Sequence, residues 1–243
     1  MRFLFICLVS FSLLFAQAND EFASFEDEFS QKSVHSSWDP LKAYNIQMTN
    51  FNDFVYMRVF GPVAKGYRYV VNKPIREGVS NIFYNLQFPI RFINNVLQLK
   101  FKNALEETAR FAINSTYGIV GFFDLATSEG GISKHDEDFG QTLGFYGASD
   151  DLHIVLPFLG PSNLRDTIGF VVDGFANPLA YAQQQQWDGF EDDNTYLYLS
   201  VYQTINEYSL HVNEYESVRK DALNLYIVLK NIYEQRRKKL IGE

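Results

Sequence analysis

The residues whose types could carry chemistry are four histidines and one short acidic run. His35, His135, His153 and His211 are far apart in the sequence, and none belongs to the His-Glu-x-x-His pattern that holds zinc on a helix. His135 directly precedes the acids 136–138, and such a set could ligate a metal ion. Three acids beside one histidine in a Gly-rich loop more often form a solvated turn, so we predict no metal site.

Motifs for nucleophilic or phosphate chemistry do not occur in the sequence. It contains no Gly-x-Ser-x-Gly elbow, phosphate loop or dinucleotide fingerprint. The single cysteine, Cys7, lies in an N-terminal segment that we expect to be removed. A Ser-His-Asp triad assembled from distant residues stays open, but serine and aspartate are too common for their presence to count. We therefore expect neither an enzyme nor a bound cofactor.

An adjacent charged pair, Arg165-Asp166, follows an apolar run that begins at Leu156. Two roles are open for Arg165. It could contact a phosphate headgroup, or it could pair with Asp124 or Asp173, because acids in apolar surroundings need a nearby cation. Pairing of Arg165 with an acid is the favoured interpretation.

The stretch that must position these residues is rich in both glycine and phenylalanine. Ten of the 15 glycines lie between Gly118 and Gly174. Glycine permits turns and close backbone approach, whereas aromatic rings need burial in protein or in lipid. The mixture predicts irregular backbone that shapes a concave, partly apolar surface; the other interpretation is a set of loops that caps a helical core.

Helical periodicity predominates on both sides of this stretch. The first helix is expected to begin with Asp39 as its N-cap and Pro40 at its first position, and to end at Gly61-Pro62. Residues at a spacing of three or four form its apolar side: Leu41, Tyr44, Met48, Phe51 and Val55. Its asparagines, Asn45, Asn50 and Asn52, either bond to neighbouring chain or are simply exposed.

Further helices are predicted over 62–70, from Lys73 to Phe88-Pro89, over 90–97 and over 102–117. Residues 152–161 are the best strand candidate, followed by a segment that Ser162 caps. Residues 196–240 predict one long helix or a pair, and the basic cluster 236–239 suits the dipole at the helix end.

The ends of the chain indicate where the protein belongs. Residues 1–18 have the charge, apolar run and small-residue cleavage site of a secretory signal peptide, and 19–38 read as a flexible, acidic arm. Residues 39–240 are expected to form a single helical domain. Cys7 lies inside the apolar run behind Ile6, so we expect no lipid anchor. The net charge of -8 argues against nucleic acid, and 16% aromatic residues indicate an aromatic-rich core or a surface that meets lipid.

Several motifs, taken in order, resemble the MlaA family, also called VacJ. They are Asp39-Pro40-Leu41, Tyr44-Asn45, Asn50-Phe51-Asn52, residues 76–85, Arg110-Phe111, Asn114-Ser115-Thr116, Gly121-Phe122-Phe123-Asp124, residues 139–144, Leu156-Pro157-Phe158 and Leu164-Arg165-Asp166. The resemblance covers about Trp38 to Tyr181 closely, and the C-terminal helices by pattern only.

The resemblance implies a mainly α-helical ring around an amphipathic channel, with a Gly-rich irregular centre and at most a short β-hairpin. Such proteins lie in the inner leaflet of the outer membrane, on its periplasmic face. They remove mislocalised phospholipid from the outer leaflet, which maintains lipid asymmetry, and pass it to a soluble periplasmic lipid carrier, usually while bound to a trimeric porin. They are typically lipoproteins, and this sequence departs from that pattern, leaving amphipathic helices and porin contact to hold it at the membrane.

Nine residues are predicted to handle lipid or to support the channel. The apolar candidates for the rim or channel are Phe122, Phe123, Leu125, Phe145, Leu156 and Phe158, with 145–158 as a gating loop. Arg165, Asp124 and Asp166 are candidates for headgroup contact or structural charge. The alternative function is a periplasmic helical scaffold that binds envelope proteins and transfers no lipid, its surface aromatics then forming a protein interface.

Overall fold

The computed structural model describes residues 39–150, 152–187, 189, 192 and 194–242. The predicted signal peptide (1–18) and arm (19–38) lie outside the described residues. The elements in chain order are α4 (Lys42–Val55), η1 (a π-helix, Tyr56–Phe60), α5 (Gly61–Val70), α6 (Lys73–Leu86), α7 (Phe88–Leu97), α8 (Phe101–Thr116), α9 (Leu125–Ser128), α10 (Phe139–Phe145), β1 (His153–Leu156), β2 (Gly160–Asn163), α11 (Leu164–Phe175), α12 (Pro178–Gln184), α13 (Thr195–Asp221) and α14 (Leu225–Gly242).

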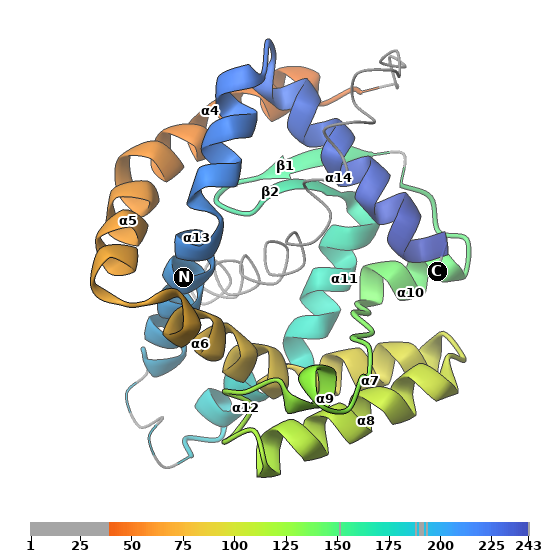
Figure 1. Cartoon of the computed structure of the whole chain (residues 1–243). Helices are drawn as coiled ribbons and strands as arrows, with labels where there is room; N and C mark the ends of the chain where they lie inside the picture. The colour runs from red at the N-terminus through yellow and green to blue at the C-terminus, as the bar shows by residue number, and fades with distance from the viewer. Residues whose placement is uncertain (1–38, 151, 188, 190–191, 193, 243) are drawn as a thin grey trace.

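The helices are arranged as a ring, as Figure 1 shows. Helix α13 packs against α5 and α6, α7 packs against α8, and α10 packs against both α11 and α14. Helix α14 then contacts α4 and β2, which closes the ring. The sequence-based expectation of a mainly α-helical ring with an irregular centre and one short hairpin is confirmed.

The first helix differs from its prediction at both ends. It begins at Lys42 with Leu41 at the N-cap, and the Asp39 carboxylate instead accepts hydrogen bonds from Asn45 and Tyr226. Gly61-Pro62 does not end it, because α4, η1 and α5 run on without interruption to Val70. The turn before the proline is π-helical, which accommodates a residue whose nitrogen cannot join the helical hydrogen-bond ladder.

The predicted strand region contains two strands, and the C-terminal segment contains two helices. Strands β1 and β2 form an antiparallel hairpin in which His153 pairs with Asn163 and Leu156 with Gly160. Asn163, and not Ser162, caps α11, since its Oδ1 accepts the backbone N–H of Asp166 at 2.7 Å. The C-terminal segment is the pair α13 and α14, not one helix.

Two asparagines of α4 hold the hairpin. The Asn45 carboxamide donates to the carbonyl of His153 at 3.1 Å and accepts the N–H of Val155 at 2.8 Å. Asn52 repeats this three residues further along the hairpin, at 2.9 and 2.7 Å. Seven residues of helix span about 10.5 Å and three residues of strand about 10 Å, so the two spacings match. These asparagines therefore bond to neighbouring chain, whereas Asn50 is exposed.

The predicted close backbone approach occurs where α10 crosses α11. A Cβ added to Gly169 would lie 2.3 Å from the backbone nitrogen of Gly140. No side chain fits in that space, so both helices need glycine at the crossing.

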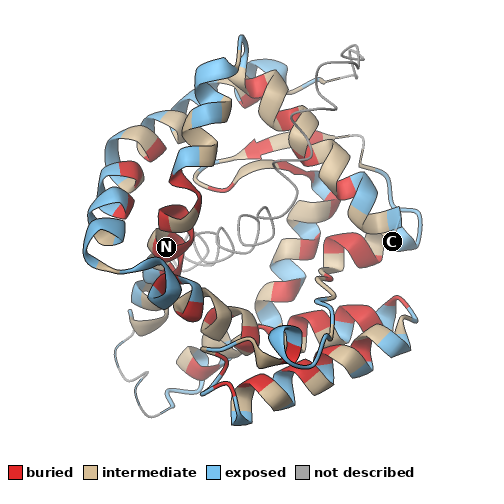
Figure 2. Ribbon diagram, viewed as in Figure 1, coloured by how far each residue is buried: buried red, intermediate tan, exposed pale blue. Residues whose placement is uncertain are grey.

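Many polar side chains of the described residues are buried, and many large apolar ones are exposed. Asn95 and Glu107 are 0% exposed, whereas Phe54 is 60% and Phe175 83% exposed. The apolar side of α4 follows this rule, since Tyr44 is exposed. Exposed residues follow the outward sides of α4 and α5 in Figure 2. Water-soluble domains show the opposite distribution, and large exposed apolar surfaces mark contact with protein or membrane.

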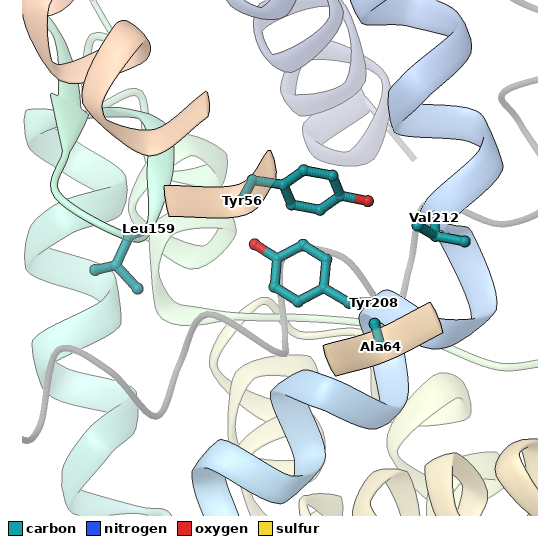
Figure 3. Packing of buried hydrophobic residues seen from close by; sticks show 5 residues of the cluster. All are labelled: Tyr56, Ala64, Leu159, Tyr208 and Val212. Carbon is teal, nitrogen blue, oxygen red and sulfur yellow. The ribbon is translucent and has the colours of Figure 1, made fainter. Parts of the chain in front are cut away.

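Apolar packing in the described chain is concentrated in a small cluster between α5, α13 and the hairpin, drawn in Figure 3. The rings of Tyr56 and Tyr208 meet edge to face with centroids 4.9 Å apart, and Ala64, Leu159 and Val212 lie around them. Over the described residues, no helix has both the length and the apolar character to cross a bilayer.

Candidate functional site

A cavity lies within the ring; the empty space in and around it is about 1080 Å³, a volume that includes open solvent. Helices α6, α7, α11, α13 and α14, the hairpin, the loop before α10 and Asn177, which caps α12, all contribute to its wall. Its apolar lining includes Ile90, Leu156, Leu159 and Phe170. Its charged lining consists of Arg91, Asp136, Glu137, Asp138, Asp166, Asp173, Glu207 and Arg237. A wall that is partly apolar and strongly charged suits an amphipathic ligand.

Arg237 joins three segments of the wall. Its Nη1 and Nη2 donate to both oxygens of Asp138 at 2.5 and 2.9 Å, and its Nη2 and Nε contact the oxygens of Asp166 at 2.9 and 2.8 Å. Tyr233, one turn earlier on α14, also donates to Asp166. Burial alone would raise the pKa of Asp138, but the Arg237 guanidinium and the Gln141 hydrogen bonds lower it to about 2.

Two earlier interpretations are corrected by this ion cluster. Arg237 does not simply face the dipole at the helix end, because it is 4% exposed and points into the ring. The acids 136–138 are not a solvated turn, since Asp138 caps α10 and Glu137 is buried. Glu137 contacts Lys100 at 2.6 Å and Gln98 at 2.7 Å. The reason is that this loop lies at the ring interior, where it meets side chains distant in sequence.

A second buried ion pair supports the part of the wall that α7 forms. Arg91 Nε contacts Glu107 Oε2 at 2.7 Å, and the guanidinium lies 3.6 Å from the centre of the Tyr84 ring. Arg110 also approaches Glu107, at 3.6 Å. Both charges of the pair are therefore compensated inside the protein, as a buried charge requires.

Two cavity carboxyls are poised between their charged and neutral forms. Burial, and next the nearby charge of Asp138, raise the pKa of Asp173 to about 7. Burial also raises the pKa of Glu207 to about 7, although the hydrogen bond from Ser80 opposes it. Within the described residues, no group of three His, Cys, Asp or Glu side chains could hold a metal ion.

Comparison with known proteins identifies the family. The family model described as MlaA lipoprotein matches residues 37–240. The chain belongs to the MlaA family. The resemblance seen in the ordered motifs is thereby confirmed.

Relatives within and around this family have been found in several bacteria. An uncharacterized protein of Rickettsia prowazekii is 30% identical over 194 residues, which is 77% of each chain. The intermembrane phospholipid transport system lipoprotein MlaA of Haemophilus influenzae is 38% identical over 144 residues, 58% of each chain. The Escherichia coli protein of that name is 36% identical over 146 residues, 59% of this chain and 58% of its own.

A solved MlaA-like structure has the same architecture. It is described as "Structural basis for maintenance of bacterial outer membrane lipid asymmetry" and is 26% identical in sequence. The TM-score is 0.70, and the match covers 84% of this chain and 99% of that one.

Only two of the nine predicted residues line the cavity. Leu156 and Asp166 line it. Arg165 pairs with its own neighbour Asp166, Nε to Oδ1 at 2.8 Å, and not with Asp124 or Asp173 as the sequence suggested. The predicted pairing was wrong because other donors already satisfy both acids.

Those donors lie on helices that were not predicted to contribute to the site. Arg110 donates to both oxygens of Asp124 at 2.9 Å. Asp173 accepts from the Asn94 carboxamide and from the backbone N–H of Phe139, each at 2.9 Å. Asp124 thus fastens the loop after α8 and does not reach the cavity.

The predicted aromatic residues lie apart from one another. Phe122 packs on α6, where its ring occupies the space that a Cβ on Gly78 would need. Its neighbour Phe123 is 49% exposed, and Leu125 next to it is half-buried. Phe145 is exposed at the end of α10. Their roles in lipid handling, and that of 145–158 as a gate, stay predictions.

Phe158 belongs to the hairpin side of the ring. It is half-buried, and its ring centroid lies 5.3 Å from that of Phe51. It borders a second, smaller pocket beside Tyr56 and Tyr208. This residue therefore sits next to the apolar cluster and away from the charged cavity wall.

Sequence reasoning missed most of the charged wall, although one signal was present. In α13, the polar residues Ser200, Gln203, Thr204, Glu207 and His211 recur at helical spacing, and all of them are buried. A polar stripe on a helix ordinarily faces water. Here the stripe is buried, and Gln203 and Glu207 from it line the cavity, so the signal was visible but its meaning was reversed.

Proposed function

We propose that this chain transports phospholipid between membranes: it removes mislocalised phospholipid from the outer leaflet of the outer membrane through the cavity of the ring. The lipid then passes to a soluble periplasmic carrier, and lipid asymmetry is maintained. Support comes from the relatives in Haemophilus and Escherichia, which are named as lipoproteins of an intermembrane phospholipid transport system.

The observation that carries the proposal is the reversed distribution of polar and apolar side chains. A lipid headgroup cannot cross hydrocarbon without a polar path, because an unpaired charge there is costly. The polar residues that line the cavity, among them Gln87, Gln203 and Glu207, would offer such a path. The exposed apolar residues outside can meanwhile lie among acyl chains, for example Phe54, Leu105 and Phe175.

We place the ring in the inner leaflet, at the periplasmic face of the outer membrane. Amphipathic helices and contact with a trimeric porin would hold it there. Passage along a preformed path needs no nucleotide and no covalent step, so the protein acts as a transporter and not as an enzyme. Phe122, Phe123 and Leu125 are proposed to lie at the rim.

The proposal is tested by phospholipid exposure on the cell surface. Deleting the gene should raise outer-leaflet phospholipid, and the wild-type chain should restore the normal level. Phe123→Glu places a charge on an exposed rim side chain, and it should restore less than Phe123→Leu while reaching the same protein level. Unchanged exposure in the deletion strain would refute lipid removal.

A second measurement separates transport from the scaffold alternative. A ring that rests in a leaflet should require detergent once purified without its N-terminal 38 residues. A monomer that stays in solution without detergent would favour a helical scaffold, in which the exposed apolar side chains serve as a protein interface.

A further inference from the structure

Glu207 on α13 has an unpaired carboxylate oxygen inside the cavity wall. The residue is 2% exposed and lines the cavity. One oxygen, Oε1, accepts a hydrogen bond from the Ser80 hydroxyl on α6. The other, Oε2, has no hydrogen-bond partner among the described residues. A buried carboxylate oxygen without a partner is costly, so its retention requires an explanation.

Carboxyls outnumber guanidiniums on the cavity wall. Six carboxyls line it, namely Asp136, Glu137, Asp138, Asp166, Asp173 and Glu207, against two guanidiniums. Both guanidiniums are already engaged: Arg91 with Glu107, and Arg237 with Asp138 and Asp166. An anionic ligand would therefore meet repulsion, whereas a cation would find unused acceptors.

Neutral donors are also present in the same cavity. The side chains of Gln87, Gln203 and Asn177 line it and are each no more than 5% exposed. Carboxamide N–H groups can donate to the oxygens of a phosphate without adding positive charge. A phosphate next to a cationic group thus fits better than a phosphate alone.

We propose that the cavity selects phospholipids whose headgroup carries a primary ammonium, the ethanolamine class, with Glu207 Oε2 accepting an N–H from that ammonium. This inference rests on the proposed function, since it assigns the headgroup to the same cavity. An ammonium offers three donors in a compact charge, and its bond to a carboxylate is charge-assisted. A choline headgroup has the charge but no N–H, and a glycerol headgroup has neither.

The protonation of Glu207 agrees with this assignment. Burial raises the pKa of its carboxyl to about 7, so in the empty cavity about half of the Glu207 carboxyls are ionised near pH 7. A bound ammonium lowers the pKa of a carboxyl beside it. The charge of Lys134 also lowers the pKa of Glu207, but its Nζ lies 3.6 Å from Asp124 Oδ2 and Lys134 is not among the residues that line the cavity.

The test is binding of short-chain phospholipids to the purified full chain in detergent. Ethanolamine, choline and glycerol headgroups with identical acyl chains are compared, with free ethanolamine as a separate arm. A single charge-assisted hydrogen bond predicts about tenfold tighter binding of the ethanolamine lipid than of the glycerol lipid. Glu207→Gln should bring that ratio to about one, and Glu129→Gln, at an exposed position beyond α9, should leave it unchanged.

Each outcome has a distinct meaning. Equal binding of all three lipids by the wild type overturns the inference and leaves transport intact, whereas no binding of any lipid refutes the proposed function as well. Saturable, Glu207-dependent binding of free ethanolamine without lipid binding would assign the site to soluble amines and overturn the lipid assignment. Melting temperatures report whether each variant is folded, and the wild-type preference tests the inference even if Glu207→Gln unfolds.

Discussion

Replacing Arg237 by methionine should destabilise the ring more than any other single change in the basic C-terminal cluster. The guanidinium is 4% exposed and makes contacts of 2.5 to 2.9 Å with two carboxylates. Its removal leaves Asp138 and Asp166 with their negative charges close together and without a cation. Methionine has a similar length and fills part of the space, so the loss is mainly electrostatic.

The size of the effect follows from the burial of the cluster. Breaking a buried ion pair by removing one partner costs about 3–5 kcal/mol. For a domain of this size, each kcal/mol lowers the melting temperature by about 2–4 °C. We therefore expect Arg237→Met to melt about 6–20 °C below the wild type.

The assay is thermal unfolding in detergent, followed by circular dichroism at neutral pH. Lys238→Met removes the neighbouring, exposed charge and should change stability by no more than about 0.5 kcal/mol. Adding Asp138→Asn and Asp166→Asn to Arg237→Met should recover part of the loss, because the uncompensated charges are then gone. Equal melting temperatures for the Arg237 and Lys238 variants would refute the reasoning.

Two further changes test other parts of the structure. The folded pKa of Asp173 is about 7 against 3.8 for the ordinary group, so the folded state binds more protons between these values. Its contribution to stability is full below about pH 4 and falls as pH rises to 7, and Asp173→Asn should remove up to about 1.4 kcal/mol per pH unit of that slope in denaturant titrations. A parallel pH profile for both proteins would contradict this. Asn45→Ala leaves a carbonyl and an N–H of the hairpin without partners and should cost about 1–3 kcal/mol, whereas Asn50→Ala, on the exposed side of the same helix, should be nearly neutral; similar losses for both would exclude the hairpin clamp.

The helices could be predicted from the sequence because their period is local. Lys73-Pro74 begins a helix where the proline pattern indicates, and Phe88-Pro89 separates α6 from α7. Gly61-Pro62 misled the prediction, because a π-helical turn lets the chain continue through a sequence that usually ends a helix. Such a turn has no reliable signature in the residues themselves.

The site was harder to predict because its contacts are distant in sequence. Arg237 meets Asp138 across 99 residues and Asp166 across 71 residues. Asp124 stood out in the sequence by its apolar and Gly-rich surroundings, yet it fastens a loop outside the cavity. Buried charge was also read as exposed charge, since a helix pattern alone cannot say whether its polar stripe faces water or a polar interior.

The closure of the ring by its last helix sets the order in which the cavity can form. Helix α14 contacts α4, α10 and β2, and it contributes Arg237 to the cavity wall. Until this helix has been synthesised, two carboxylates at the lumen lack their cation and the circle of helices has a gap. The nascent chain therefore exposes apolar surface before the cavity has formed. The ring is completed only when α14 meets α4, which closes a loop nearly as long as the domain, and contacts between residues so distant in sequence form slowly.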